Sequence, residues 1–482
     1  MISKNFIRSS FIYTVAGALP MASAILLLPF YIAYLPTQVY GALSLYLAFS
    51  IFIQIVVAYS FDSSIYIHYH DYKNDVKKLS SFISSAFIFM IFIGAGVGLL
   101  FVLIGDLVFD WVFDDEKISF YPFGLMAVAT GIFQALFKVY CNILQSSEKP
   151  LLFLRSNILS FVFIAGLTIG GLYLFPSTLI GPIAGRMLAG FVVVCWTLYR
   201  VFSQFGSRFD YGLLKSTFGF NHYAFIYQIQ LWVINYFDRF LMLFFLPLAA
   251  IGIYDFALKC LVVIEFIMSG LHNSFSPKVV SAITGQSVKG STPEINRYYH
   301  GLTALVMLMI SSGILVLPFI VDSIDKNRGY GDAVQYFPYI AILYVLKSMR
   351  LFFAVPYGIL KYTKPLPVIY FLISVIKIGL MLLLIRKFEI YGVVASTLIS
   401  AALEILLLRF VLRERFNFQF NIFKIVIAPL MLLTVVLFLE PLLGKDFAWE
   451  LHLFYLVVTV GFLLWVYRNE LKLFNFTKIL SS

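Results

Sequence analysis

Long apolar stretches alternate with short polar connections from one end of the chain to the other. A helix needs about 20 predominantly apolar residues to cross the hydrocarbon core of a bilayer. Fourteen segments meet this requirement and predict an all-α polytopic membrane protein with about 14 transmembrane helices. The expected spans are residues 11–34, 42–60, 82–105, 120–141, 157–174, 178–199, 220–245, 249–271, 301–321, 333–357, 366–385, 390–408, 425–439 and 451–467. The last two are short or weak, so a count of twelve stays open.

The composition agrees with this assignment. Of the 482 residues, 61% are hydrophobic and 12% are charged, and the mean hydropathy is +0.93, whereas soluble domains are roughly half apolar. The net charge of +11 comes from basic residues scattered singly between apolar runs, which argues against a nucleic-acid surface. The three cysteines lie in apolar segments without paired spacing, so we expect no disulfide framework, metal site or cofactor. No connecting loop is long enough for a catalytic domain, and we do not expect an enzyme.

The distribution of basic residues predicts the orientation, because cytoplasmic loops carry an excess of Lys and Arg. With the N-terminus inside, 22 of the 35 basic residues fall in cytoplasmic segments, 6 in external segments and 7 within spans. Both termini are then cytoplasmic. The external connection between the third and fourth spans is acidic, with Asp106, Asp110, Asp114, Asp115 and Glu116.

A short internal repeat indicates how the spans are grouped. Residues 35–41 (LPTQVYG) align with residues 246–252 (LPLAAIG), an offset of 211 residues, and each copy connects two spans on the same predicted side. Six spans per unit return the chain to that side, as in parallel transporter repeats. We therefore predict two pseudo-symmetric six-helix lobes, residues 1–205 and 206–415, around a central cavity, followed by two additional C-terminal helices in residues 416–482.

Seven basic residues lie inside the expected spans, where a charge is costly and is by default a candidate functional residue. They are Lys138, Arg186, Arg239, Lys259, Lys347, Arg350 and Lys377. Together they indicate a pathway for an anion. Lys138 lies near the cytoplasmic end of its span, where we expect its long side chain to snorkel to the interface.

The seventh span carries Gln228, Trp232, Asn235 and Arg239 on one helical face. This face is either a cavity wall or a polar seam between helices. In the tenth span, Lys347 and Arg350 are three residues apart and share a face. Two like charges there repel each other, which makes a purely structural role harder to explain unless acids oppose them. A pyrophosphate would satisfy both.

The four acids within the spans are candidates for coupling to a proton or cation, since burial can raise a carboxyl pKa towards neutrality. They are Asp238, Asp255, Glu265 and Glu404. Structural pairing is the alternative. Glu404 or Glu265 would pair with Arg186 or Lys377, and Asp255 with Lys259 at the favourable i,i+4 spacing.

Three local patterns resemble a known family. The first is the segment 35–41 after the opening helix, and the second is Asp238-Arg239 followed by Gly252-Ile253-Tyr254 and Ala257-x-Lys259. The third is the run 390–397 (IYGVVAST). In their order and spacing, the chain resembles the Wzx-type polysaccharide-repeat flippases of the multidrug/oligosaccharidyl-lipid/polysaccharide (MOP) exporter superfamily.

The resemblance implies a multi-pass protein of the bacterial cytoplasmic membrane that flips undecaprenyl-pyrophosphate-linked oligosaccharide, such as an O-antigen or capsule repeat unit, to the outer leaflet by alternating access. In related flippases the cationic cavity is lined largely by helices one, two, seven and eight, with help from four, five, ten and eleven. That favours Arg239, Lys259, Lys347, Arg350 and Lys377 over Arg186.

The partners expected are the lipid-linked oligosaccharide and membrane lipids, with a polysaccharide polymerase and chain-length machinery as further partners. Two alternatives belong to the same superfamily. A lipid II flippase is the nearer one, because no motif specifies the glycan. A cation-coupled multidrug exporter fits less well, because seven basic residues outnumber four acids within the spans.

Overall fold

The computed structural model describes residues 4–113, 118–284, 293–325, 328–413, 420–442 and 449–471. Throughout these ranges the regular elements are helices, and no strand occurs among them, so the predicted all-α class is confirmed. Every expected span is helical over most of its length. The predicted acidic positions Asp114, Asp115 and Glu116 lie outside the described residues.

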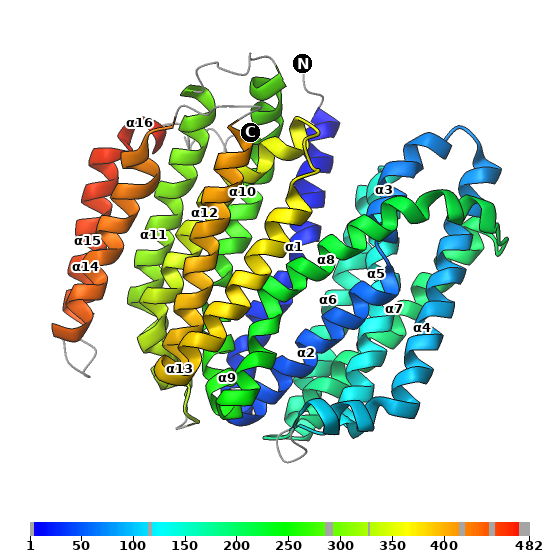
Figure 1. Cartoon of the computed structure of the whole chain (residues 1–482), viewed down its shortest axis with the longest axis horizontal. Coiled ribbons are helices and arrows are strands. Elements are labelled where there is room, and N and C mark those ends of the chain that lie inside the picture. The colour runs from blue at the N-terminus through cyan, green and yellow to red at the C-terminus, as the bar shows by residue number, and fades with distance from the viewer. Residues whose placement is uncertain are drawn as a thin grey trace. The chain divides into compact units, whose positions relative to one another are not determined.

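The chain forms two compact units, Met1–Asp255 and Phe256–Ser482, whose helices are labelled in Figure 1. This division follows packing and places α8 with the helices that precede it. The lobes predicted from span counting, residues 1–205 and 206–415, describe a topological repeat and stay a prediction.

In the first unit, an N-terminal group of long helices packs side by side. Its elements are α1 (Lys4–Tyr34), α2 (Thr37–Ala58), α3 (Phe61–Tyr72), α4 (Val76–Val112), η1 (Phe120–Gly124), α5 (Leu125–Ser146), α6 (Pro150–Leu174), α7 (Ile180–Phe205), α8 (Tyr211–Phe245) and the start of α9 (Leu248–Cys260). Helix α5 packs against α2 and α7, and α6 packs against α1 and α7. Helix α8 lies against α2, α3 and α4, which brings its polar face close to the α2–α3 junction.

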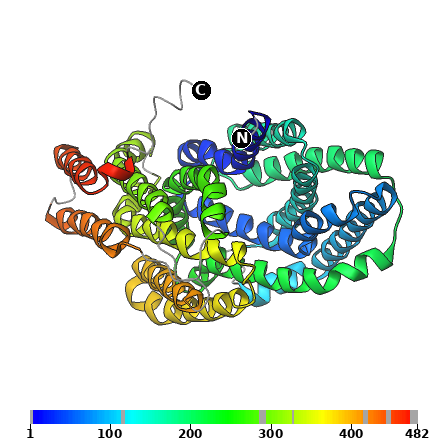
Figure 2. The ribbon, with the colours of Figure 1, turned by 90° about the horizontal axis from the view of Figure 1, so that it is seen from above.

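The second unit is built around α12. Its elements are the end of α9, α10 (Val262–Thr284), α11 (Pro293–Ile324), η2 (Gly331–Tyr336), α12 (Phe337–Ile359), α13 (Leu366–Leu412), η3 (Phe423–Ile427), α14 (Ala428–Leu442), α15 (Trp449–Val466) and α16 (Arg468–Leu471). Helix α12 packs against α10, α11, α13 and α14, and Figure 2 shows these helices from above. Non-helical backbone at Glu389 (φ 49°, ψ −127°) divides α13 into the two expected spans.

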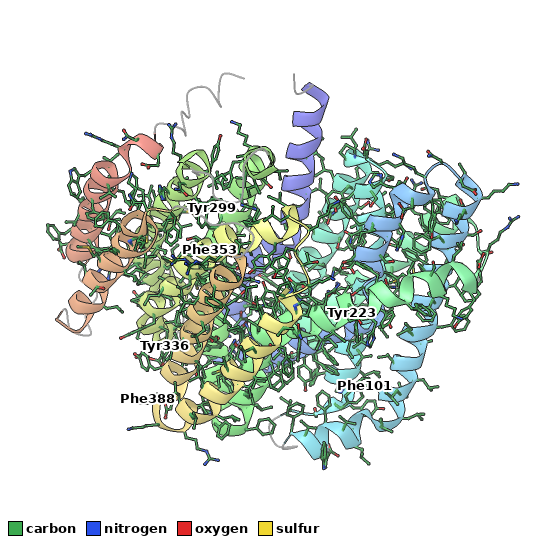
Figure 3. The ribbon with its side chains drawn as sticks, turned by 45° about the horizontal axis from the view of Figure 1, so that its top comes forward. Phe101, Tyr223, Tyr299, Tyr336, Phe353 and Phe388 are labelled. Atoms are coloured by element: carbon green, nitrogen blue, oxygen red, sulfur yellow. The ribbon has the colours of Figure 1, made fainter. Side chains whose placement is uncertain are left out.

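Aromatic side chains pack against one another in both units, as Phe52 and Trp232 do in the first, and Figure 3 labels several aromatic residues. In the second unit, the ring centroids of Tyr299 and Phe352 lie 4.7 Å apart in an edge-on arrangement. Such pairs add to the stabilisation that burial gives. The high aromatic content therefore contributes to helix packing as well as to any interfacial belt.

The C-terminal helices are attached to α11 by polar contacts. Lys424 Nζ lies 2.7 Å from Glu470 Oε1, and His300 Nδ1 lies 3.5 Å from the same oxygen. Burial by itself raises the pKa of Glu470, but the hydrogen bond and charge of Lys424 outweigh it and lower that pKa. Ser311 of α11 also donates to Thr459 of α15 at 3.2 Å.

Helix α2 ends at a sharp break rather than at a loop. Tyr59 (φ 42°) and Ser60 (φ 56°) adopt left-handed backbone. Helix α3 then continues to Tyr72, through residues that lie between the expected spans 42–60 and 82–105. Left-handed conformations are costly for residues with a Cβ. Surrounding contacts must therefore hold this junction in place.

The two repeat copies have the same local structure. In both, Leu-Pro directly precedes the first helical residue, and the leucine N–H donates four residues back, from Leu35 to Tyr31 and from Leu246 to Met242. The copies also touch: a Cβ added at Gly41 would collide with the backbone of Leu248, and one added at Gly252 would collide with the backbone of Thr37. The glycines thus allow α2 and α9 to cross in direct backbone contact.

We expect Gly41→Ala to destabilise the protein by about 1–3 kcal/mol, because the added methyl group meets a backbone that cannot rotate away. Thermal unfolding of the purified protein in detergent measures this effect. Gly166→Ala is the matched control, since its Cβ meets nothing within 4 Å and alanine favours the helix. Equal stability of the two variants would show that the crossing is loose.

Candidate functional site

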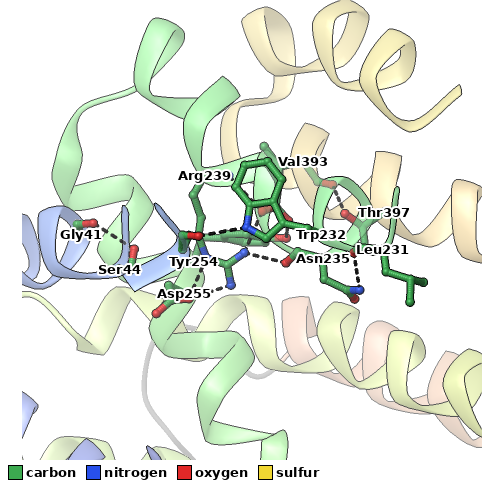
Figure 4. Close-up of polar contacts among 12 residues, drawn as sticks. Gly41, Ser44, Leu231, Trp232, Asn235, Arg239, Tyr254, Asp255, Val393 and Thr397 are labelled. Atoms are coloured by element: carbon green, nitrogen blue, oxygen red, sulfur yellow. Dashed lines mark hydrogen bonds and ion pairs between the residues drawn. The ribbon is translucent and has the colours of Figure 1, made fainter. Parts of the chain in front are cut away.

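A buried ionic network joins α8 and α9. Arg239 donates from Nε and Nη2 to Asp255 Oδ1 at 2.9 and 2.7 Å, and from Nη1 to Asp238 Oδ1 at 2.8 Å. The exposed fractions of Arg239, Asp255 and Asp238 are 6%, 1% and 3%, respectively. Figure 4 shows the guanidinium group of Arg239 directed at Asp255. A single guanidinium group thus forms ion pairs with two buried carboxylates.

Two tyrosines complete the network. Tyr254 donates to Asp238 Oδ2 at 2.8 Å, and Tyr40 of α2 donates to Asp255 Oδ2 at 3.2 Å. Buried charges persist when they are paired and hydrogen-bonded. The network therefore fixes α8, α9 and α2 to one another. In this conformation the predicted substrate ligand, Arg239, is paired with two of the predicted coupling acids, Asp238 and Asp255.

The polar face predicted on α8 forms a seam with neighbouring backbone and side chains. Gln228 Nε2 donates to Ser60 Oγ at 3.1 Å and to Asp62 Oδ1 at 3.2 Å, and Trp232 donates to the carbonyl oxygen of Ala48 at 2.9 Å. The exposed Asn235 donates to the carbonyl oxygen of Leu231 in its own helix at 2.7 Å (Figure 4). In this conformation, Gln228 and Trp232 make the contacts expected of a helix–helix seam.

Asp62 is a buried acid that the sequence analysis missed. It follows the α2–α3 break, is 5% exposed, and forms an ion pair with Lys138 of α5 at 2.8 Å. Lys138 thus has an acid partner within the unit. The expectation that its side chain snorkels to the interface named no such partner. The sequence does contain a sign that Asp62 lies within a helix and not in a polar loop, because apolar residues continue after it, at Ile65 and Ile67.

In the second unit, acids from two other helices oppose the two cations of α12. Lys347 Nζ lies 2.6 Å from Glu265 Oε2 of α10, and Arg350 Nε lies 2.6 Å from Glu404 Oε1 of α13. Arg350 also donates from Nη2 to the hydroxyl of Tyr370 at 3.1 Å. The pairs explain how two like charges three residues apart are tolerated on one helix.

The sequence did not predict these pairings. The alternative of structural pairing named Arg186 or Lys377 as partners of Glu265 and Glu404, and the structure places Lys347 and Arg350 against these acids. Partner choice depends on which helices are neighbours, which spacing along the chain does not reveal. Arg186 of α7 instead donates to the hydroxyl of Tyr31 in α1 at 3.2 Å.

The two remaining predicted cations differ in how far they are buried within the protein. Lys377 of α13 is 3% exposed, and Lys259 is half-buried on α9, one turn after Asp255. The structure therefore brings Asp238, Arg239 and Asp255 together in one unit, and Lys347, Arg350, Glu265 and Glu404 together in the other. Sequence reasoning missed Tyr40, Tyr254 and Tyr370, since a tyrosine in an apolar segment gives no sign that its hydroxyl meets a charge.

The family model for polysaccharide biosynthesis proteins matches residues 6–277, more than half of the chain. The chain belongs to this family. The expectation of a flippase-type member of the MOP superfamily is thereby supported at the level of the family. No curated protein sequence matches the chain.

Solved structures of MOP superfamily transporters share the fold. The lipid II flippase MurJ in an inward closed conformation has a TM-score of 0.69 at 16% identity, covering 97% of this chain and 99% of that one. An inward-facing multidrug resistance MATE family transporter has a TM-score of 0.59 at 13% identity, covering 83% and 95%. A MOP superfamily transporter from Pyrococcus furiosus has a TM-score of 0.51 at 10% identity, covering 84% and 95%. At these identities the likeness shows the fold, which is that of a multi-pass membrane transporter.

Proposed function

We propose that this polysaccharide biosynthesis protein is a flippase for undecaprenyl-pyrophosphate-linked oligosaccharide, an O-antigen or capsule repeat unit, moving it from the cytoplasmic to the outer leaflet by alternating access. The observation that carries this proposal is the pair of cations on α12. Lys347 and Arg350 lie three residues apart inside the membrane segment, and their side chains are 25% and 34% exposed. A charge within a membrane segment is by default a candidate functional residue, and two cations three residues apart can bind the two phosphate groups of a pyrophosphate.

The two side chains would bind phosphate in different ways. Arg350 offers a planar fork for two phosphate oxygens, while Lys347 acts as a point charge. Lys377 lies on a neighbouring helix, α13, and would assist. Arg239, Lys259 and Arg186 are further candidates for the pyrophosphate, and Gln228, Trp232 and Asn235 for the glycan, while the polyprenyl tail stays in lipid.

Coupling of transport to a proton or cation would use buried carboxylates. The candidates are Asp238, Asp255, Glu265 and Glu404, each of which lies against a basic side chain. A carboxylate whose basic partner leaves would take up a proton more readily. We place the protein in the bacterial cytoplasmic membrane with both termini in the cytoplasm, working with a polysaccharide polymerase and chain-length machinery.

Lipid II is the second candidate substrate. The structure of the lipid II flippase MurJ aligns over 97% of this chain, and lipid II also carries a pyrophosphate, so both substrates fit a pair of cations. A multidrug exporter is the third candidate, because MATE family transporters share the fold. Cationic drugs would be repelled by Lys347 and Arg350 unless Glu265 and Glu404 neutralised them.

Reconstitution tests the proposal directly. The full chain in proteoliposomes should transfer labelled undecaprenyl-pyrophosphate oligosaccharide between leaflets, measured by its accessibility to an impermeant glycosidase. Protein-free vesicles give the background rate. Faster transfer of lipid II would favour the second candidate, and uptake of a cationic drug without lipid transfer would contradict the flippase.

A further inference from the structure

The ion pairs of α12 differ in how far they are open to their surroundings. In the first pair, the side chains of Lys347 and Glu265 are 25% and 31% exposed. In the second pair, Arg350 is 34% exposed while Glu404 is 5% exposed. Part of each cation's side chain is therefore exposed in spite of its acid partner.

An anion that binds these cations must compete with carboxylates already in place. Glu265 comes from α10, which precedes α12 in the chain, and Glu404 comes from α13, which follows it. In each pair the carboxylate oxygen lies 2.6 Å from the nitrogen of the cation. They are part of the same folded unit, so their effective concentration near the cations is high and does not depend on substrate. A pyrophosphate consequently binds less tightly than it would to two unpaired cations.

A transporter benefits from such competition, because affinity differences appear mainly in the rate at which the ligand leaves. Lys347 and Arg350 without partners would hold a pyrophosphate for a long time. Carboxylates that return to the cations would shorten that time. The same acids also keep the empty site neutral, which lowers the cost of burying two charges.

We propose that Glu265 and Glu404 are release residues, which compete with the substrate pyrophosphate for Lys347 and Arg350 and so set how quickly it leaves. This inference rests on the proposed flippase function and assigns these acids a role beyond it. Glu404 is the stronger competitor, because a buried carboxylate without its cation is more costly than a partly exposed one. Glu265 exchanges first and Glu404 second.

Tyr370 supports this order. Its hydroxyl accepts from Arg350 at 3.1 Å, and the guanidinium carbon lies 5.6 Å from the centre of its ring. These contacts keep Arg350 in position while Glu404 is displaced. Arg350 can then bind a phosphate oxygen without moving away from α13.

The test compares binding with turnover for the full chain in lipid nanodiscs and proteoliposomes. Binding of inorganic pyrophosphate is measured by calorimetry, and lipid-linked oligosaccharide transfer by the glycosidase assay. Glu404→Gln should bind pyrophosphate about 10-fold more tightly, equivalent to about 1.4 kcal/mol, and transfer lipid more slowly. Glu265→Gln should show the same changes to a smaller extent.

Two controls separate release from general damage. Glu404→Asp keeps the charge and should retain weak binding and faster transfer than Glu404→Gln. Glu450→Gln removes an exposed acid at the start of α15 and should change neither quantity.

The outcomes are distinct. Failure of the unsubstituted protein to bind pyrophosphate would overturn the cation clamp and this inference with it. Normal binding by that protein, with unchanged or weaker binding by both Gln variants, would overturn the release role alone and leave the clamp intact.

Discussion

Replacing both Lys347 and Arg350 by Ala should abolish surface glycan in cells that depend on this protein. Each charge-assisted hydrogen bond to phosphate contributes about 1.5–3 kcal/mol. Losing two of them lowers the affinity for pyrophosphate by roughly 100-fold or more. Surface glycan and lipid-linked oligosaccharide transfer measure the loss, and immunoblots of membrane fractions measure the amount of protein.

The double variant also leaves Glu265 and Glu404 without their cations, so a second variant is needed. A quadruple variant in which these acids are Ala as well has no unpaired carboxylate and should reach normal membrane levels, yet it should still lack export. Arg386→Ala with Lys387→Ala removes the same two residue types from exposed positions and serves as the matched control. Normal glycan export by the quadruple variant would contradict the pyrophosphate clamp.

Arg239→Ala should destabilise the protein more than Gly41→Ala does. It leaves Asp238 and Asp255, which are 3% and 1% exposed, as buried carboxylates without their cation. Breaking a buried pair in this way costs about 3–5 kcal/mol. Thermal unfolding in detergent should show a large decrease in midpoint, and Arg239→Lys should recover only part of it, since a lysine cannot bind two carboxylates as a planar fork does.

The first repeat copy supplies the control for this network. At the offset of 211 residues, the positions of Asp238, Arg239 and Asp255 correspond to Leu27, Leu28 and Ser44. A triple variant carrying leucine, leucine and serine at the three positions has no buried charge to leave unpaired. It should be more stable than Arg239→Ala, and the opposite order would show that Arg239 contributes little to the fold.

The sequence predicted the helices more fully than it predicted their contacts. Apolar runs of about 20 residues specify spans because a backbone in lipid must satisfy its own hydrogen bonds. The same logic correctly separated residues 366–385 from residues 390–408, although a single helix label, α13, covers both around Glu389. It ended the second span at Ser60, where α2 breaks, but did not find the left-handed backbone at Tyr59 and Ser60, since neither residue is a glycine or proline.

The candidate site was predicted residue by residue but not pair by pair. Every cation within a span was identifiable, because a charge in an apolar run stands out. The acid that meets it was not, because Glu265 and Lys347 are 82 residues apart and come together only through the packing of α10 against α12. The i,i+4 spacing of Asp255 and Lys259 favoured a local pair but gave no sign that Asp255 binds Arg239 from the preceding helix.

The crossing of Gly41 and Gly252 has the form of a self-complementary interface. In a symmetric homodimer the same surface patch faces itself across a two-fold axis, and here one chain provides both patches through its two repeat copies. Each glycine is confined by the backbone of the opposite copy. Substitutions at the two positions should therefore be non-additive: once one added methyl group has forced α2 and α9 apart, the second enters a gap that already exists.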